Sequence, residues 1–130
     1  YDGVSCDPKH LAHVENAARR GTRENGYGRV SMWYAILCED IENSLERRQA
    51  ARPAHLERLR ELTDEGRVLV AGPYPALDCE DPGAAGFTGS LMILDFPDLA
   101  SAEAWAQSDP YVEAGVFASV KVKPFRKVLP

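Results

Sequence analysis

The chain has 130 residues, a length typical of one domain, and 45% of them are hydrophobic, which excludes an intrinsically disordered protein. The formal net charge is −5, so the chain lacks the basic surface expected of a nucleic-acid-binding protein. The longest apolar run, which ends at Cys38, is far shorter than the roughly 20 residues of a membrane-spanning helix. The three cysteines have no CxxC spacing and indicate neither a disulfide framework nor a zinc site. We therefore expect a cytoplasmic domain that binds neither nucleic acid nor membrane.

The first 31 residues differ in composition from the remainder. Residues 1–31 carry five Lys or Arg against four Asp or Glu, whereas residues 32–130 carry ten against sixteen. The first segment also lacks a sustained apolar period, which a packed element requires. We expect 1–31 to be a flexible N-terminal extension outside the fold, with Met32 as the natural start. An ordered helix over 8–20 is the alternative.

The first half of the folded region predicts a strand followed by helix. Residues 32–38 are apolar, aromatic and β-branched at both parities, which is typical of a strand covered on both faces. A helical region follows, with Asn43 or Ser44 as its N-cap. Because Pro53 disfavours helical geometry in the preceding residue, we expect two helices, over 44–51 and 53–65.

Three further strands and a helix are predicted in the second half. Residues 67–72 form a strand that we expect to end before Pro73. A turn-rich loop leads to a strand over 89–96, and a helix then runs through Ala106. After a short turn or helix beginning at Asp109, the alternating residues 116–122 predict the last strand.

The order of elements is β-α-β-β-α-β, which predicts an α+β fold of the ferredoxin-like kind. In this fold a four-stranded antiparallel sheet carries its helices on one face. Two of the predicted strands, 32–38 and 89–96, are nevertheless apolar at both parities. Since a large apolar sheet face is unusual on a stable monomer, we expect a homodimer that packs sheet against sheet.

His55 is the single histidine of the folded region. In helical projection it falls between Leu59 and Leu62, on the apolar side of its helix. An imidazole there is either a core residue with satisfied hydrogen bonds or a pocket residue able to move protons near neutral pH. Position alone leaves the two interpretations open.

Other candidate residues have ordinary structural interpretations beside the functional ones. Asp109 precedes Pro110, a pattern typical of a helix start, and its carboxylate is also able to orient a histidine. Ser90 follows Gly89 at the start of a strand, where turn chemistry is the ordinary reading of its hydroxyl. A cluster of arginines on the first helix is usually a solvated face, but one or two of its members suit an anionic or phenolate ligand: Arg47, Arg48 and Arg52. One usable histidine does not build a three-histidine metal site, and no dinucleotide or P-loop motif is present.

Four motifs carry a resemblance to a known family. They are RPAHL around His55, AGP at 71–73, GSL at 89–91 and DPYVEAGV from Asp109. With them, residues 32–130 resemble the YciI-like family, also called the YCII-related domain. The resemblance implies a dimeric α/β barrel, with His55 and Asp109 as the proposed catalytic pair. It also makes Ser90 and Arg47, of the SLERR segment 44–48, companions in the pocket.

Two functions from different classes are consistent with these residues. The first is an enzyme without a metal or organic cofactor that acts on a small phenolic or lactone-like molecule by elimination, dehalogenation or isomerisation. In it His55 is the acid or base, Asp109 orients it, and Ser90 with Arg47 or Arg52 holds an oxyanion. The second is a non-catalytic dimer that binds a small molecule or assists another protein.

Overall fold

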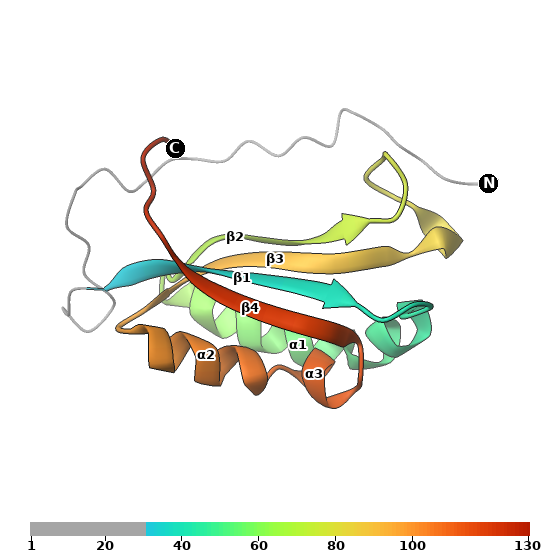
Figure 1. Cartoon of the computed structure of the whole chain (residues 1–130), viewed down its shortest axis with the longest axis horizontal. Helices are drawn as coiled ribbons and strands as arrows, with labels where there is room; N and C mark the ends of the chain where they lie inside the picture. The colour runs from blue at the N-terminus through green and yellow to red at the C-terminus, as the bar shows by residue number, and fades with distance from the viewer. Residues whose placement is uncertain (1–30) are drawn as a thin grey trace.

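The computed structural model describes residues 31–130, which form one antiparallel sheet with the α-helices on one side (Figure 1). The elements in chain order are β1 (Met32–Asp40), α1 (Leu45–Asp64), β2 (Val68–Pro75), the short 3₁₀ helix η2 (Gly83–Ala85), β3 (Phe87–Phe96), α2 (Leu99–Gln107), α3 (Pro110–Glu113) and β4 (Phe117–Phe125). The expected N-terminal extension, 1–31, lies outside the described residues apart from its last member. No helix within 31–130 is both long and apolar enough to cross a membrane.

The sheet has the strand order β2-β3-β1-β4, with every neighbouring pair antiparallel. β1 therefore lies at the centre, where it pairs with β3 on one side and β4 on the other. This confirms the ferredoxin-like α+β fold. The register places Cys38 of β1 opposite Ser90 of β3, near the end of the sheet where the motif GSL begins.

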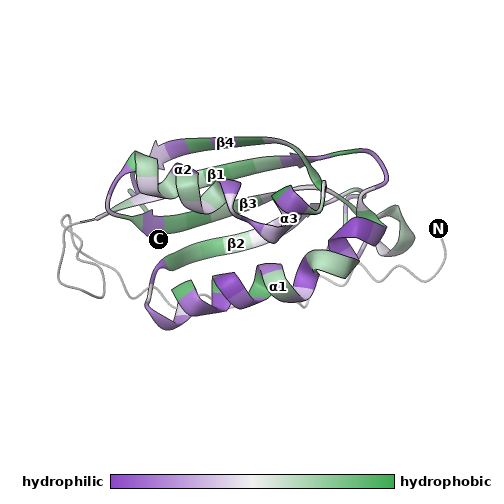
Figure 2. Cartoon of the chain, turned by 90° about the horizontal axis from the view of Figure 1, so that it is seen from below, coloured by the Kyte–Doolittle hydropathy of each residue, from purple (hydrophilic) through white to green (hydrophobic). Residues whose placement is uncertain are grey.

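The two faces of the sheet carry separate apolar clusters, because side chains alternate along a strand. Towards the helices, Tyr34, Ile36 and Cys38 pack in one core that includes residues of α1 and α2. Trp33 and Ala35 belong to a second cluster on the opposite face. Figure 2 shows the strands mostly hydrophobic and α1 with hydrophilic stretches between hydrophobic ones. The double apolarity of β1 thus corresponds to two real clusters.

The prediction of two helices around Pro53 is wrong, since α1 is a single helix of 20 residues with Pro53 inside it. Proline removes one helical hydrogen bond, the one that would reach the carbonyl of Gln49. Both Pro53 and Gln49 are exposed, so water is able to satisfy that carbonyl. Contacts on either side, described below, hold the two halves of α1 on the same helical axis.

The predicted end of the strand before Pro73 is also wrong, because β2 continues through Pro73 to Pro75. β2 is an edge strand. An edge strand pairs on one side only, so it tolerates residues that lack a backbone N–H. β4, at the other edge, likewise includes Pro124. The edge position, which the local sequence does not reveal, decides how prolines are accommodated here.

Gly89 marks a close approach between β3 and its neighbours. A Cβ atom at this position would lie 2.1 Å from the Cys38 carbonyl oxygen and 2.8 Å from Cδ2 of Tyr74. The backbone contact cannot be relieved by moving a side chain. Glycine is therefore required for β1 and β3 to pair at the register that positions Ser90.

We expect Gly89→Ala to lower the free energy of unfolding by about 1–3 kcal/mol or more, as overpacking in a closed region does. Gly72→Ala is the matched control, because a Cβ there meets no atom of the described residues within 4 Å. Chemical denaturation of both variants measures the difference. Equal midpoints for the two variants would contradict the steric role of Gly89.

Candidate active site

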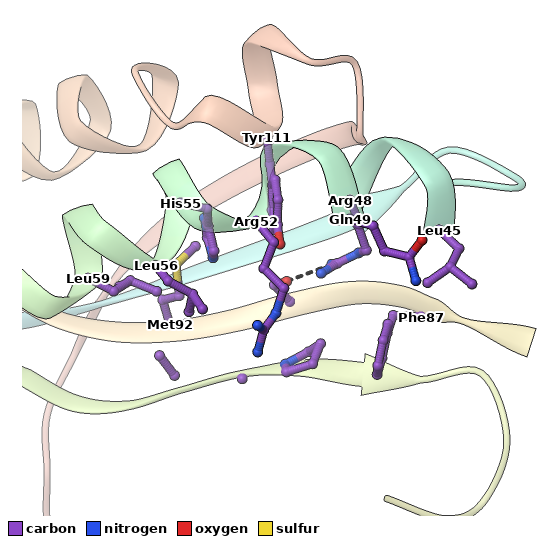
Figure 3. Close-up of a pocket in the computed structure, with 14 residues that line it drawn as sticks. Leu45, Arg48, Gln49, Arg52, His55, Leu56, Leu59, Phe87, Met92 and Tyr111 are labelled. Atoms are coloured by element: carbon purple, nitrogen blue, oxygen red, sulfur yellow. Dashed lines mark hydrogen bonds between the residues drawn. The ribbon is translucent and has the colours of Figure 1, made fainter. Parts of the chain in front are cut away.

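A cavity of about 450 Å³ lies between α1 and the sheet, with its floor on β2 and β3 (Figure 3). Its walls are largely apolar, and its polar side chains come mainly from α1. The apolar contributors include Leu45, Leu56, Leu59, Pro73, Phe87 and Met92. Apolar walls with a few polar groups are characteristic of small-molecule sites.

His55 and Asp109 form a buried pair beside this cavity. Nδ1 of His55 lies 2.9 Å from Oδ1 and 3.0 Å from Oδ2 of Asp109. The exposed fractions are 6% for His55, which lines the cavity, and 1% for Asp109. α1 brings the imidazole, and the start of α3 brings the carboxylate. The structure thus joins two residues that are 54 positions apart in the chain.

Asp109 is at once a helix cap and a partner of the histidine. Its Oδ1 accepts a hydrogen bond of 2.8 Å from the backbone N–H of Tyr111, and Pro110 occupies the first turn of α3. The Asp-Pro pattern therefore does set a helix start, as its ordinary reading predicts. The cap fixes the carboxylate, and the fixed carboxylate reaches Nδ1 of His55.

The pairing determines how a neutral His55 presents its ring. An ionised carboxylate only accepts hydrogen bonds, so Nδ1 must carry the hydrogen. In a neutral imidazole the other nitrogen, Nε2, then holds a free lone pair. Within 31–130 no residue hydrogen-bonds to Nε2, and His55 lines the cavity. This arrangement leaves one nitrogen available as a base.

Tyr111 lies between His55 and Arg48 along the cavity wall (Figure 3). Its ring stacks on the imidazole with centroids 3.9 Å apart and planes 11° from parallel, and the Arg48 guanidinium carbon lies 5.0 Å from its centroid. Burial raises the pKa of Tyr111, although the charges of Arg48 and Arg52 act in the opposite direction. Tyr111 is not among the residues predicted for the site, although it belongs to the DPY motif.

Arg48 forms the second polar group of the site. Its Nε donates a hydrogen bond to Oδ2 of Asp40, and its Nη2 donates one of 3.0 Å to Oδ1 of the same carboxylate. Both side chains are buried. Nη2 also donates to the Ser90 hydroxyl at 2.7 Å and to the Gly89 carbonyl at 2.9 Å. Ser44, expected as a cap through its side chain, makes no such bond and instead donates to Asp40. Ser90 is thus held at the cavity by a buried ion pair.

The other two arginines of α1 occupy different positions. Arg52 lines the cavity with an exposed side chain. Arg47 does not line it, and its Nη1 reaches the Gly115 carbonyl at 3.4 Å. The sequence showed three basic residues on one helix, but only the tertiary contacts show that Arg48 is the buried one beside Ser90.

Cys38 is not a reactive thiol, and the described part of the chain has no cluster of metal ligands. Cys38 is fully buried, and this burial, with the charges of Asp109 and Asp40, raises the pKa of its thiol to about 12. Its sulfur is therefore protonated at neutral pH, as expected for an inert core cysteine. Among residues 31–130 no three His, Cys, Asp or Glu side chains are grouped as metal ligands would be.

Fold and site together define a ferredoxin-like α+β protein with a buried His–Asp pair beside an apolar cavity. The family model of the YCII-related domain matches residues 32–126. The chain belongs to this family, which the sequence motifs had indicated. All the site residues described above lie within the matched range.

The chain is also similar to known proteins over nearly the whole length of those proteins. The chain is 60% identical over 97 residues to "Protein YciI" of Escherichia coli O6:H1, which covers 75% of this chain and 99% of that protein. A Haemophilus influenzae protein is 57% identical over the same number of residues. A solved structure of 5-chloro-2-hydroxyhydroquinone dehydrochlorinase (TftG) from Burkholderia phenoliruptrix AC1100, in complex with 2,5-dihydroxybenzoquinone, is similar with a TM-score of 0.65 and 26% identity. This similarity covers 73% of this chain and 94% of that one.

We expect Arg48→Met to destabilise the protein by about 3–5 kcal/mol, because it leaves the buried Asp40 carboxylate without its cation. Arg47→Met removes a neighbouring arginine whose side chain is exposed, and should change the free energy of unfolding by less than about 0.5 kcal/mol. Urea denaturation of both variants is the measurement. Similar midpoints for both would show that the Asp40–Arg48 pair does not stabilise the fold.

Proposed function

We propose that this protein is an enzyme that uses the His55–Asp109 pair for acid–base chemistry on a small phenolic or lactone-like molecule, without a metal or organic cofactor. The observation that carries the proposal is the buried Nδ1 contact with Asp109, which leaves Nε2 of a cavity-lining histidine without a partner in the described residues. A core histidine with only a structural role would be expected to have both ring nitrogens hydrogen-bonded.

In the proposed reaction Nε2 of His55 takes a proton from a ring hydroxyl or ring carbon of the substrate. The electron pair left behind moves into the ring, and the ring carbon that bears the leaving group takes up a proton and becomes tetrahedral. A second ring hydroxyl then loses its proton to the same base, and its electron pair expels the leaving group as an anion, so the net reaction is loss of HX from the ring. In an isomerisation the proton returns at another atom instead. Asp109 keeps its negative charge and stabilises the imidazolium that forms. Such positioned proton transfer typically contributes about 10²–10⁴-fold in rate.

The oxygen that becomes negative would be held at the Arg48 end of the cavity. Ser90 already accepts a hydrogen bond from Arg48 at 2.7 Å, so its own hydroxyl hydrogen is left to donate to a ligand oxygen. Arg52, at the exposed side of the cavity, adds a cation that suits a phenolate. Pre-positioned donors of this kind are worth about 3–4 kcal/mol of transition-state stabilisation.

The similarity to TftG supports this substrate class. That protein is a dehydrochlorinase of a hydroxylated aromatic ring, and its structure contains a dihydroxybenzoquinone. The cavity of about 450 Å³, with Phe87 and Tyr111 among its walls, has the size and the aromatic lining for a single small ring. We therefore favour an elimination or isomerisation of a hydroxylated ring over other acid–base reactions.

A non-catalytic function in ligand binding or as an accessory protein is the second candidate. The same buried contact also supports this second candidate, because His55 and Asp109 satisfy each other's hydrogen bonding and connect α3 to α1. The two candidates differ in what His55 does for the molecule, and a single substitution separates them.

We expect His55→Gln to fold normally, to retain ligand binding, and to lose about 10²–10⁴-fold of the turnover of hydroxylated or chlorinated ring substrates. The glutamine amide still donates a hydrogen bond to Asp109 but does not accept a proton near neutral pH. Thermal-shift screening of phenols, quinones and lactones identifies the ligand, and steady-state kinetics measures the loss.

Leu56→Met is a control that alters the neighbouring cavity wall while leaving the pair intact, and it should retain most of the turnover. If His55→Gln instead loses about 1–3 kcal/mol of stability while every turnover assay of the parent protein stays at background, the binding function is correct.

We also propose that the chain forms a homodimer through the sheet face opposite the helices. Several apolar residues around the Trp33 cluster are only partly buried, so they have surface left to cover: Leu37, Leu69, Leu91 and Phe125. Sheet-to-sheet packing with two-fold symmetry would cover them.

Light scattering at micromolar concentration should give twice the mass of one chain. Leu91→Lys, on the proposed interface, should shift the protein toward the monomer, because association would bury an unpaired ammonium group. Leu99→Lys is the matched control, since Leu99 is 39% exposed on α2. A single-chain mass for the unmodified protein would contradict the dimer.

A further inference from the structure

Arg58 approaches the histidine–aspartate pair but does not line the cavity. It lies three residues after His55 on α1, close to the same face of the helix. Its Nη2 donates to the Trp105 carbonyl at 3.0 Å, and its guanidinium carbon lies 4.2 Å from the centroid of the Trp105 ring. These two contacts with α2 fix the orientation of the guanidinium plane.

The remaining end of the guanidinium is buried and makes no hydrogen bond with the described residues. Nη1 of Arg58 has no hydrogen-bond partner among residues 31–130, although it is shielded from solvent. It lies 3.9 Å from Oδ2 of Asp109, the oxygen that His55 shares at 3.0 Å. A buried donor without a partner is costly, so the position of Nη1 calls for an explanation.

We propose that Arg58 is a positioning residue that acts through Asp109 and disfavours the imidazolium form of His55. The inference rests on the proposed function, because it assigns Arg58 a role only toward the reaction of His55. It adds a third member, on the same helix, to the pair that the sequence motifs indicate.

The charges around His55 explain this effect of Arg58. With Asp109 ionised and Arg58 protonated, the buried group is electrically neutral only when the imidazole is uncharged. Protonation of His55 adds a second cation close to Arg58 in a region of low dielectric constant, where such repulsion is weakly screened. Without Arg58, the carboxylate would have the histidine as its one close cation and would favour the imidazolium form.

Other charged or titratable groups around the pair do not offer the same control. Burial lowers the pKa of Arg58 itself, but a guanidinium still remains protonated at neutral pH. Cys38 on β1 and Tyr111 on α3 have raised pKa values and are uncharged. In the part of the chain that the structure describes, three other charged groups lie near the pair or near Arg58. They are Arg48, which is bound to Asp40, Arg52 at the exposed side of the cavity, and Glu61 beside Arg58.

A purely structural role is the alternative, in which Arg58 only connects α1 to Trp105. Arg67 provides a matched control for that role. It also stacks on an aromatic ring, at 5.2 Å from the centroid of Phe96, and also donates to a backbone carbonyl, that of Asp95. Removing Arg67 therefore removes the same kinds of contact without removing a charge beside Asp109.

The experiment is an NMR titration of the histidine side chains in the full chain, with His55→Gln used to identify the His55 signals. Arg58→Gln retains an amide donor for the Trp105 carbonyl but removes the charge. It should raise the pH at which His55 is half-protonated by on the order of one unit. Arg58→Lys, which retains the charge, should shift this midpoint much less, and Arg67→Gln should not shift it. Once a substrate is found, the acidic limb of the pH profile of kcat/KM should move in parallel.

An unchanged midpoint in Arg58→Gln, or an equal shift in Arg67→Gln, would overturn the inference while leaving the catalytic role of His55 intact. If Arg58→Gln is too unstable to study, Arg58→Met and Arg58→Lys give the same comparison of uncharged with charged side chains. The titration needs no substrate, so it is independent of the proposed function. Full activity in His55→Gln would overturn that function and with it the role of Arg58 in catalysis.

Discussion

The architecture of this site depends on two buried carboxylates, each of which requires a hydrogen-bonding or cationic partner. Asp40 and Asp109 both have side chains that are 1% exposed, and an isolated carboxylate in such surroundings is strongly disfavoured. One helix supplies the partners of both: Arg48 for Asp40, and His55 with Arg58 for Asp109. Residues seven and then three positions apart share one side of a helix. α1 therefore meets both carboxylates only if it remains a single helix between them.

This requirement gives a physical account of Pro53. The proline weakens α1 locally, by the loss of one hydrogen bond on its exposed side. A break there would rotate Arg48 and His55 relative to each other and would separate at least one of them from its carboxylate. Breaking a buried pair costs about 3–5 kcal/mol, which exceeds or matches the cost of roughly 3 kcal/mol for proline inside a helix. The ionic contacts therefore keep α1 continuous through Pro53.

The same contacts divide the cavity into two chemically different ends. At one end the His55 imidazole presents Nε2, and at the other Arg48 holds the Ser90 hydroxyl. Tyr111 lies between them, with its ring stacked on the imidazole and close to the guanidinium. A base at one end and hydrogen-bond donors at the other suit a small ring that loses a proton while an oxygen gains charge. The proposed function rests on this arrangement together with membership of the YCII-related domain family and the similarity to a ring dehydrochlorinase.

The sequence by itself determined the order of strands and helices, the apolar pattern of β1 and, through its motifs, the candidates His55, Asp109 and Ser90. These features are local, because alternation, turn residues and short motifs are written in neighbouring positions. Only the tertiary structure decided that α1 passes through Pro53, that β2 continues to Pro75, and that Arg48, rather than Arg47, lies beside Ser90. Each of these outcomes depends on what a segment packs against: a buried carboxylate, a free sheet edge, or a hydroxyl on another strand. Such partners are distant in sequence, and their interaction energies override the local preferences from which the predictions were made.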